Sequence, residues 1–229
     1  GYFRSSSIQV GEYTLTNNGS TSYYDGMIIK YNSSGEVEWA RSVGGSNNEY
    51  IYSVASTSDG GAIVGGYFRS SSIQVGEYTL TNNGSTGYTD GMIIKYNSSG
   101  EVGWARSVGG SDDDYIQSVA STSDGGSIVG GLFSSSSIQV GEYTLTNNSS
   151  STIYEDGMII KYNSRGEVEW ARSVGGSIDD RILSVAETSD GGAIVGGHFR
   201  SRSIQVGNYT LTNNSSSTSY NDGMIIKLE

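Results

Sequence analysis

The sequence contains no cysteine and no proline, and histidine occurs only once. The absence of cysteine excludes disulfide bonds and thiolate metal sites, and it is compatible with both a cytosolic and an exported protein. Charged residues make up 16% of the chain, below the roughly 25% of an ordinary domain. Apolar runs are short, as in Met27–Ile29, whereas a membrane-spanning helix needs about 20 apolar residues. We therefore expect no membrane span.

Basic residues are also scarce relative to acidic ones. The net charge is −11 and the isoelectric point is near 4.5. A nucleic-acid interface needs clustered lysine and arginine to replace the counterions of the phosphate backbone. We therefore expect the chain not to bind DNA or RNA.

Glycine is abundant, with 34 residues among 229, and this composition suits β-structure with many tight turns. The abundance reflects an internal repeat. The motif Gly-Tyr-Phe-Arg at residue 1 returns at residues 66, 131 and 197 with small changes. We predict one repeat domain, 1–229, with units 1–65, 66–130 and 131–196 and a partial unit 197–229.

The two ends of the chain interrupt the repeat. Leu228-Glu229 stands where an earlier unit has Tyr31-Asn32, and there is neither an initiating methionine nor a signal-peptide pattern. Together with the near-identity of the copies, this suggests a further hypothesis, that the chain is an engineered or excised segment made to study how such units assemble.

Turn motifs divide each unit into strands. Thr57–Gly61 is an Asp-Gly turn that joins a strand at 51–56 to one at 62–68. The segment 32–35 likewise joins a strand at 27–31 to one at 36–43. An alternating segment at 7–16 predicts an additional hairpin. No segment has the apolar spacing of an amphipathic helix, so we predict essentially no helix.

Four strands repeated at a fixed period are typical of β-propeller blades, which bury their faces against neighbouring blades. The run Asp-Gly-Met-Ile-Ile-Lys-Tyr-Asn-Ser-Ser-Gly-Glu-Val-Glu-Trp, followed by Gly-Gly-Ser and Ser-Asp-Gly-Gly, resembles the bacterial SBBP-type β-propeller repeat and, more distantly, NHL-type blades. The resemblance implies an exported bacterial protein with about 65-residue four-stranded blades. It also implies an innermost strand near Ile51 and an outermost strand at Trp39, and it carries no catalytic residues.

The predicted blades are incomplete at both ends. The first lacks its inner strand and the last its outer one, giving three and a half repeats. Exposed strand edges invite pairing with another chain. We therefore expect self-association, for example two chains that contribute to one ring.

The copies differ mainly in two loops that would emerge on one face. We interpret these differences mainly as drift in tolerant loops after a recent duplication, and the alternative is selection for a ligand that binds there. Acidic residues are frequent there: Asp112, Asp113, Asp114, Asp179 and Asp180. Carboxylates that converge on a ring could hold calcium, yet no loop has the spacing of an EF-hand. We therefore interpret them mainly as solvated turn residues and predict neither a metal nor a cofactor.

Tyrosine occurs 17 times, among many asparagine and serine residues. Tyr23, Tyr88, Tyr154 and Tyr220 occupy equivalent positions beside the variable loop. They could contact a sugar or a protein, because tyrosine rings stack and their hydroxyls form hydrogen bonds. The alternative is that tyrosine simply suits the half-exposed surface of a strand.

An enzyme is not predicted. The single imidazole, His198, occupies a position where other copies have tyrosine or leucine, and one histidine cannot supply a catalytic triad. An acidic hydrolase would need a distinctive carboxylate pair, which the repeated acids do not provide. We predict a non-catalytic scaffold or protein-interaction module, located outside the cell or on its surface, with a multivalent lectin-like module as the alternative.

Overall fold

A computed structural model describes residues 1–149, 151–215 and 219–228. Within these ranges the chain forms 22 β-strands and no helix, so the prediction of an all-β fold is confirmed. All strand pairs are antiparallel. Consequently the described ranges also hold no helix with the length and apolarity to cross a membrane.

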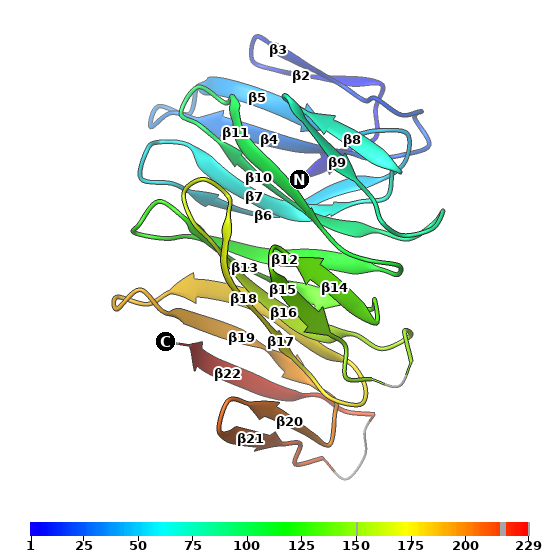
Figure 1. Cartoon of the computed structure of the whole chain (residues 1–229). Coiled ribbons are helices and arrows are strands. Elements are labelled where there is room, and N and C mark those ends of the chain that lie inside the picture. The colour runs from blue at the N-terminus through cyan, green and yellow to red at the C-terminus, as the bar shows by residue number, and fades with distance from the viewer. Residues whose placement is uncertain (150, 216–218, 229) are drawn as a thin grey trace.

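Four larger sheets follow one another along the chain (Figure 1). The first has the order β1-β4-β5, at Tyr2–Phe3, Asp25–Tyr31 and Val37–Val43. The second has the order β6-β7-β10-β11, at Glu49–Ser56, Ala62–Phe68, Asp90–Tyr96 and Val102–Val108. The third has the order β12-β13-β16-β17, at Asp114–Ser121, Ser127–Phe133, Asp156–Tyr162 and Val168–Val174. The fourth has the order β18-β19-β22, at Asp180–Glu187, Ala193–Phe199 and Asp222–Leu228.

Every sheet has a two-stranded hairpin, which lies in the chain directly before β4, β10, β16 or β22, as the pattern at 7–16 predicts. The hairpin strands are β2 (Ser7–Val10) with β3 (Tyr13–Thr16), β8 (Ser72–Val75) with β9 (Tyr78–Thr81), β14 (Ser137–Val140) with β15 (Tyr143–Thr146), and β20 (Ser203–Val206) with β21 (Tyr209–Thr212). In the described part of the chain, the first sheet has no strand equivalent to β6 and the fourth has no strand equivalent to β11, as expected from the sequence.

Each complete sheet has two different ends. The turn end carries the tight turns at 57–61 and 97–101 and their copies, and the loop end carries the longer loops at 82–89 and 109–113 and their copies. At the turn end Gly60 has a φ of 77°, a left-handed conformation that favours glycine. Asp59 accepts hydrogen bonds from the Thr57 hydroxyl at 2.6 Å and the Gly61 N–H at 2.9 Å, which fix the turn.

The sheets stack face to face, and the apolar core lies between them. Between the second and third sheets, Ile63 and Ile93 pack with Ile116 and Val119, and all four side chains are buried. Gly65 allows this close approach, because an added Cβ would lie 2.6 Å from a methyl group of Val119. Burying one aliphatic side chain of this size contributes about 1.5–3 kcal/mol, so the stability of each sheet depends on its neighbour.

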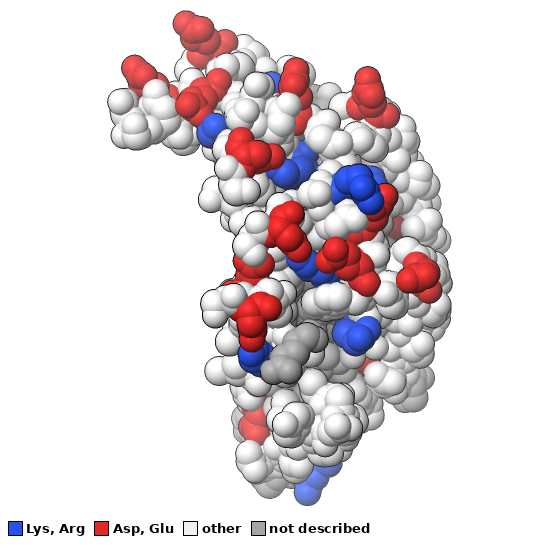
Figure 2. Space-filling model, turned by 60° about the vertical axis from the view of Figure 1, so that its left-hand side comes forward, with Lys and Arg blue, Asp and Glu red and all other residues white. Residues whose placement is uncertain are grey.

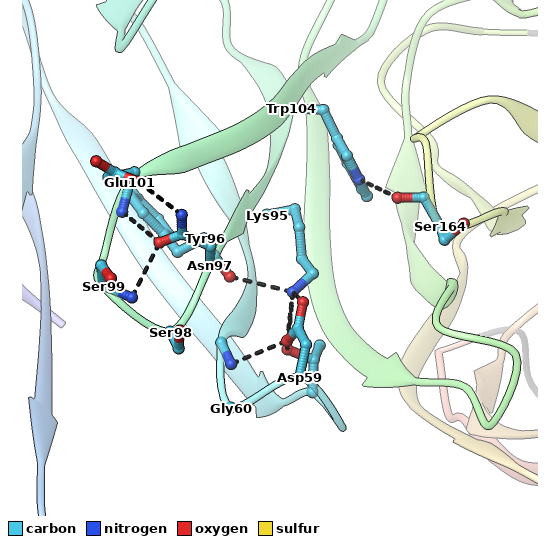
Figure 3. Close-up of polar contacts among 12 residues, drawn as sticks. Asp59, Gly60, Lys95, Tyr96, Asn97, Ser98, Ser99, Glu101, Trp104 and Ser164 are labelled. Carbon is cyan, nitrogen blue, oxygen red and sulfur yellow. Dashed lines mark hydrogen bonds and ion pairs between the residues drawn. The ribbon is translucent and has the colours of Figure 1, made fainter.

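Polar contacts join adjacent sheets at the turn end. The Trp104 indole N–H donates to the Ser164 carbonyl of the next sheet at 3.2 Å (Figure 3). The Arg106 Nε–H donates to the Gly166 carbonyl at 2.9 Å. Trp39 makes the same contact with the Ser98 carbonyl at 3.0 Å. Trp39 and Trp104 therefore both connect their own sheet to the next one.

The stack forms an open, curved arc with the first and fourth sheets at opposite ends (Figures 1 and 2). Among the residues that the structure describes, no sheet closes on itself. The outer face of the fourth sheet exposes Ile225 by 81% and Ile194 by 43%, whereas the equivalent Ile159 and Ile128 are fully buried under the next sheet. The arc therefore ends in an uncovered stacking face.

Candidate functional site

A row of two acids and a phenylalanine lies at the loop end of the second, third and fourth sheets. In the second sheet Glu49, Phe68 and Asp90 lie side by side across β6, β7 and β10. All three are fully buried. The third sheet repeats the row with Asp114, Phe133 and Asp156, and the fourth with Asp180, Phe199 and Asp222.

Two of the predicted acidic site residues belong to this buried row. Asp114 accepts hydrogen bonds from the Gly110 N–H at 2.7 Å and the Ser135 hydroxyl at 2.8 Å. Asp180 has the same two kinds of partner. Burial raises the pKa of Asp114 to about 7 and that of Asp180 above its ordinary value. Both carboxyl groups anchor the loops between sheets and have no surface exposed to solvent.

In the second acid of the row, only one of the two carboxylate oxygens accepts a hydrogen bond. Asp90 Oδ2 accepts from the Asn83 N–H at 2.9 Å, whereas Oδ1 is buried without a hydrogen-bond partner. Asp25 and Asp156 have the same orphaned oxygen. Burial raises the pKa of Asp90 and of Asp156 to about 6. Gly109 leaves room for this carboxyl, because an added Cβ would lie 2.4 Å from its atoms.

The other predicted acids lie nearer the surface. Asp113 is partly exposed and accepts hydrogen bonds from the N–H of Thr89 at 3.0 Å and from its hydroxyl at 2.9 Å. Asp112, beside it, accepts from the Ser111 hydroxyl at 2.7 Å. Asp179 forms an ion pair with Arg200. The structure thus separates three partly exposed acids from the two buried ones.

The four predicted tyrosines lie in the loops of the loop end. Tyr23 and Tyr88 are 36% and 38% exposed, Tyr154 is partly buried and Tyr220 is 67% exposed. Asn17 Nδ2 donates to the Tyr23 carbonyl at 3.0 Å, and the equivalent asparagines make the same bond in the other copies. Within the described ranges no ring contact joins these four side chains to one another.

A different set of tyrosines forms a continuous aromatic surface across the loop ends of the first three sheets. We call it the tyrosine cluster, and its members are Tyr2, Tyr24, Tyr50, Tyr52, Tyr67 and Tyr115. The rings of Tyr50 and Tyr67 stack with centroids 5.0 Å apart, and Tyr115 meets Tyr67 edge to face, also at 5.0 Å. Tyr2 and Tyr52 are 48% and 46% exposed. The cluster is therefore both rigidly packed and accessible.

The chemistry of this surface changes along the arc. The cross-strand pair next to the buried row is Tyr50 with Tyr67 in the second sheet, Tyr115 with Leu132 in the third and Arg181 with His198 in the fourth. Arg181 forms an ion pair with Glu155. The pKa of His198 is lowered by burial and by the nearby positive charge of Arg181. One end of the surface is thus aromatic and the other is charged.

The sequence signal for the tyrosine cluster lies in the differences between copies. Tyr24 is replaced by Thr89, and Tyr52 by Gln117, in the next unit. These differences mark the variable face, but the predicted site rested on Tyr23 and its equivalents instead. Members of the cluster are far apart in sequence, and only the stacking of the sheets brings them together.

A shallow groove occurs at two equivalent places between a hairpin and an outer strand. One, of about 560 Å³, is lined by Arg41, Gln74 and Glu101. The other, of about 380 Å³, is lined by the equivalent side chains of the next unit, Arg106, Gln139 and Glu167. Within the described ranges, no three histidine, cysteine, aspartate or glutamate residues are grouped so as to hold a metal ion.

No protein-family model matches the chain. Over 115 residues, half of this chain, it is 31% identical to the regulatory protein FlaEY of Caulobacter vibrioides, and the match spans 12% of that protein. A crystal structure of a protein of unknown function from Bacteroides caccae covers 82% of this chain, with 11% identity and a TM-score of 0.30, and 73% of that chain is covered in turn.

Proposed function

We propose that this chain is a non-catalytic scaffold of β-propeller blades in an exported bacterial repeat protein, and that its loop end binds another protein outside the cell or at its surface. The observation that carries the proposal is the tyrosine cluster. Tyrosine gives a large, rigid contact area at low entropic cost, and serine, asparagine and glycine supply adaptable hydrogen bonds, as in antibody paratopes. The same residue types dominate this end of the stack.

A scaffold function is supported by how the copies differ. The turn end keeps the Ser-Asp-Gly-Gly turn in every copy that contains it, whereas the loop end changes from tyrosine to leucine, arginine and histidine. A constant frame with one varied end suits a binding module. The resemblance to SBBP-type repeats, which implies propeller blades and export, agrees with this assignment.

A selection experiment tests the protein-binding function. A displayed random-peptide library is panned on the wild type and, in parallel, on the double variant Tyr2→Ser/Tyr52→Ser. We expect peptides that bind the wild type and bind the double variant about tenfold more weakly, because interface tyrosines often contribute 2 kcal/mol or more. The control is Tyr31→Ser/Tyr209→Ser, which removes two exposed tyrosines outside the cluster. Equal loss in both double variants, or no selected peptide at all, would contradict the proposal.

Self-association is part of the same proposal. The uncovered face with Ile194 and Ile225 corresponds to the face that each earlier sheet packs against the next one. A second chain stacked there would continue the arc towards a closed ring. Light scattering coupled to size exclusion should show a dimer or larger species at high micromolar concentration, and Ile225→Asp should return it to a monomer. A monomeric wild type would refute this part.

The lectin-like alternative is supported by the two equivalent grooves, whose volumes fall in the range of small-ligand sites. Their arginine, glutamine and glutamate side chains suit hydroxyl groups. A glycan array separates the two functions. Binding that is lost in Gln74→Ala/Gln139→Ala and kept in Tyr2→Ser/Tyr52→Ser would favour the lectin, and no signal from folded protein would eliminate it.

Absence of catalysis is likewise a proposal. His198 is the sole imidazole, and the acids of the loop end recur from copy to copy. Turnover on a pooled hydrolase substrate panel, lost on Asp113→Asn, would overturn it.

A further inference from the structure

One arginine is missing from an otherwise repeated arrangement at the loop end. The residue that follows the buried phenylalanine is Arg4, Arg69 and Arg200 in the first, second and fourth copies, but it is Ser134 in the third. All four stand directly after the phenylalanine that ends the strand. The third copy therefore differs from the others by the loss of one guanidinium group.

The fourth sheet shows what this arginine does when it faces a carboxylate. Arg200 forms an ion pair with Asp179, and its backbone N–H donates to the Asp179 carbonyl at 2.9 Å. In the third sheet the Ser134 N–H donates to the Asp113 carbonyl, also at 2.9 Å. The backbone and the carboxylate are thus the same, and only the arginine side chain is absent.

The second sheet shows that the carboxylate is not required for the fold. There, Asn48 occupies the position of Asp113, and its side-chain oxygen accepts from the Tyr24 N–H at 3.0 Å. Asp113 accepts the equivalent bond from the Thr89 N–H at 3.0 Å. Since asparagine can accept this hydrogen bond, the negative charge of Asp113 is not needed for it.

The surroundings of Asp113 are acidic and aromatic. Asp112 is adjacent and partly exposed. Tyr115, two residues further on, joins this position to the tyrosine cluster through its contact with Tyr67. Among the described residues, no lysine or arginine forms an ion pair with Asp112 or Asp113.

Resting on the proposed protein-binding function, we propose that Asp113 is a docking site for an arginine side chain of a partner polypeptide. The incoming guanidinium takes the role that Arg200 has towards Asp179, and the tyrosine cluster contacts the adjoining residues of the partner. Arg4 already lies over the Tyr24 ring, with 5.6 Å from the guanidinium carbon to the ring centroid, so the cluster accommodates arginine. The net charge of −11 favours a basic partner.

A peptide titration tests the site directly. Acetyl-Gly-Arg-Gly-amide is titrated into the full chain, and backbone amide shifts of Asp112, Asp113 and Tyr115 are followed by NMR. Peptides with lysine or glutamate in place of arginine are titrated in parallel. We expect the arginine peptide to bind about fivefold more tightly than the lysine peptide, because a planar guanidinium can form two hydrogen bonds with one carboxylate. The glutamate peptide should leave these shifts unchanged.

Two substitutions taken from the other copies provide matched variants. Ser134→Arg restores the missing arginine, which should pair with Asp113 and weaken peptide binding about tenfold or more. Asp113→Asn removes the charge while keeping the bond to Thr89, and it should have a similar effect. The control is Glu142→Gln, which removes an exposed acid in the β14–β15 turn. Unchanged binding in Ser134→Arg and Asp113→Asn, or no binding by the wild type, would overturn the assignment.

Failure of this site is distinguishable from failure of the protein-binding function. If library peptides lose affinity in Tyr2→Ser/Tyr52→Ser but are unaffected by Ser134→Arg, the tyrosine cluster binds a partner without an arginine anchor. If neither change affects them, both proposals are wrong.

Discussion

The Lys95 ammonium group lies 2.8 Å from Asp59 Oδ2 and ties the third strand of the second sheet to the turn between its first two strands (Figure 3). Lys95 is buried and also donates to the Thr57 hydroxyl at 2.8 Å and the Tyr96 carbonyl at 3.1 Å. The hydrogen bond from Lys95 holds the pKa of Asp59 well below its usual range. The same lysine–aspartate pair recurs in the third and fourth sheets.

Replacing Asp59 by asparagine should therefore destabilise the chain. The buried ammonium of Lys95 loses its counter-charge, which costs about 1–3 kcal/mol in free energy of unfolding. Urea unfolding followed by tryptophan fluorescence measures the change. Asp190→Asn is the matched control, because its lysine partner is much more exposed, and it should have the smaller effect. Equal effects would show that burial of the lysine is unimportant.

The buried acidic residues at the loop end predict that the stability of the chain depends on pH. Burial raises the pKa of Glu49 to about 7, as it does for Asp114, and that of Asp90 and Asp156 to about 6. These values exceed those of the unfolded chain, so the folded state binds more protons. Their contribution to stability is complete below about pH 4 and is lost as the pH rises through 6 to 7.

We therefore expect the free energy of unfolding to fall between pH 5 and pH 8, on the order of 1 kcal/mol for each such group. The low pKa of Asp59 acts in the opposite sense, but only at pH values below this window. Urea titrations at several pH values measure how steeply the free energy of unfolding changes with pH. Asp90→Asn/Asp156→Asn should flatten this dependence, and a wild type whose stability is constant or rises over this range would contradict the assignment.

The contact between Trp104 and the next sheet predicts that the effect of a tryptophan substitution on stability depends on where the tryptophan lies along the arc. Trp104→Phe removes the hydrogen bond to the Ser164 carbonyl and leaves a small void, which should cost about 1–3 kcal/mol. Trp170 occupies the same position in the third sheet, but it is less buried, and the fourth sheet has no equivalent of the Ser164 turn within the described residues. Trp170→Phe should therefore cost less. Thermal unfolding of both variants compares them, and the reverse order would be inconsistent with this account.

Local turn chemistry made much of the fold predictable from the sequence. The turn at 57–61 and the alternation at 7–16 predict strands that agree with β6, β7, β2 and β3 to within about two residues. Closure of the sheets into a propeller ring stays a prediction, because it depends on how far each sheet rotates against the next.

The candidate site was less predictable for two physical reasons. Asp114 and Asp180 follow loops and are charged, so the sequence suggests solvent exposure, whereas their hydrogen bonds to serine and glycine allow full burial. Tyr50 and Tyr115 lie 65 residues apart in equivalent strands. Their place in one surface requires the sheets to stack, which no local pattern specifies.

Two glycines at equivalent positions test whether stacking stabilises the arc. An added Cβ at Gly65 would lie 2.6 Å from Val119 and 2.7 Å from Ile116, so Gly65→Ala forces the second and third sheets apart. We expect a loss of about 1–3 kcal/mol in free energy of unfolding. Gly196 occupies the equivalent position in the fourth sheet, and no atom of the described residues lies within 4 Å of the added carbon. Gly196→Ala should be neutral or stabilising by about 0.5 kcal/mol, since alanine suits a strand interior better than glycine. Urea unfolding distinguishes the two, and if Gly196→Ala were as damaging as Gly65→Ala, the face of the fourth sheet would have to be covered in solution, most simply by a second copy of the chain.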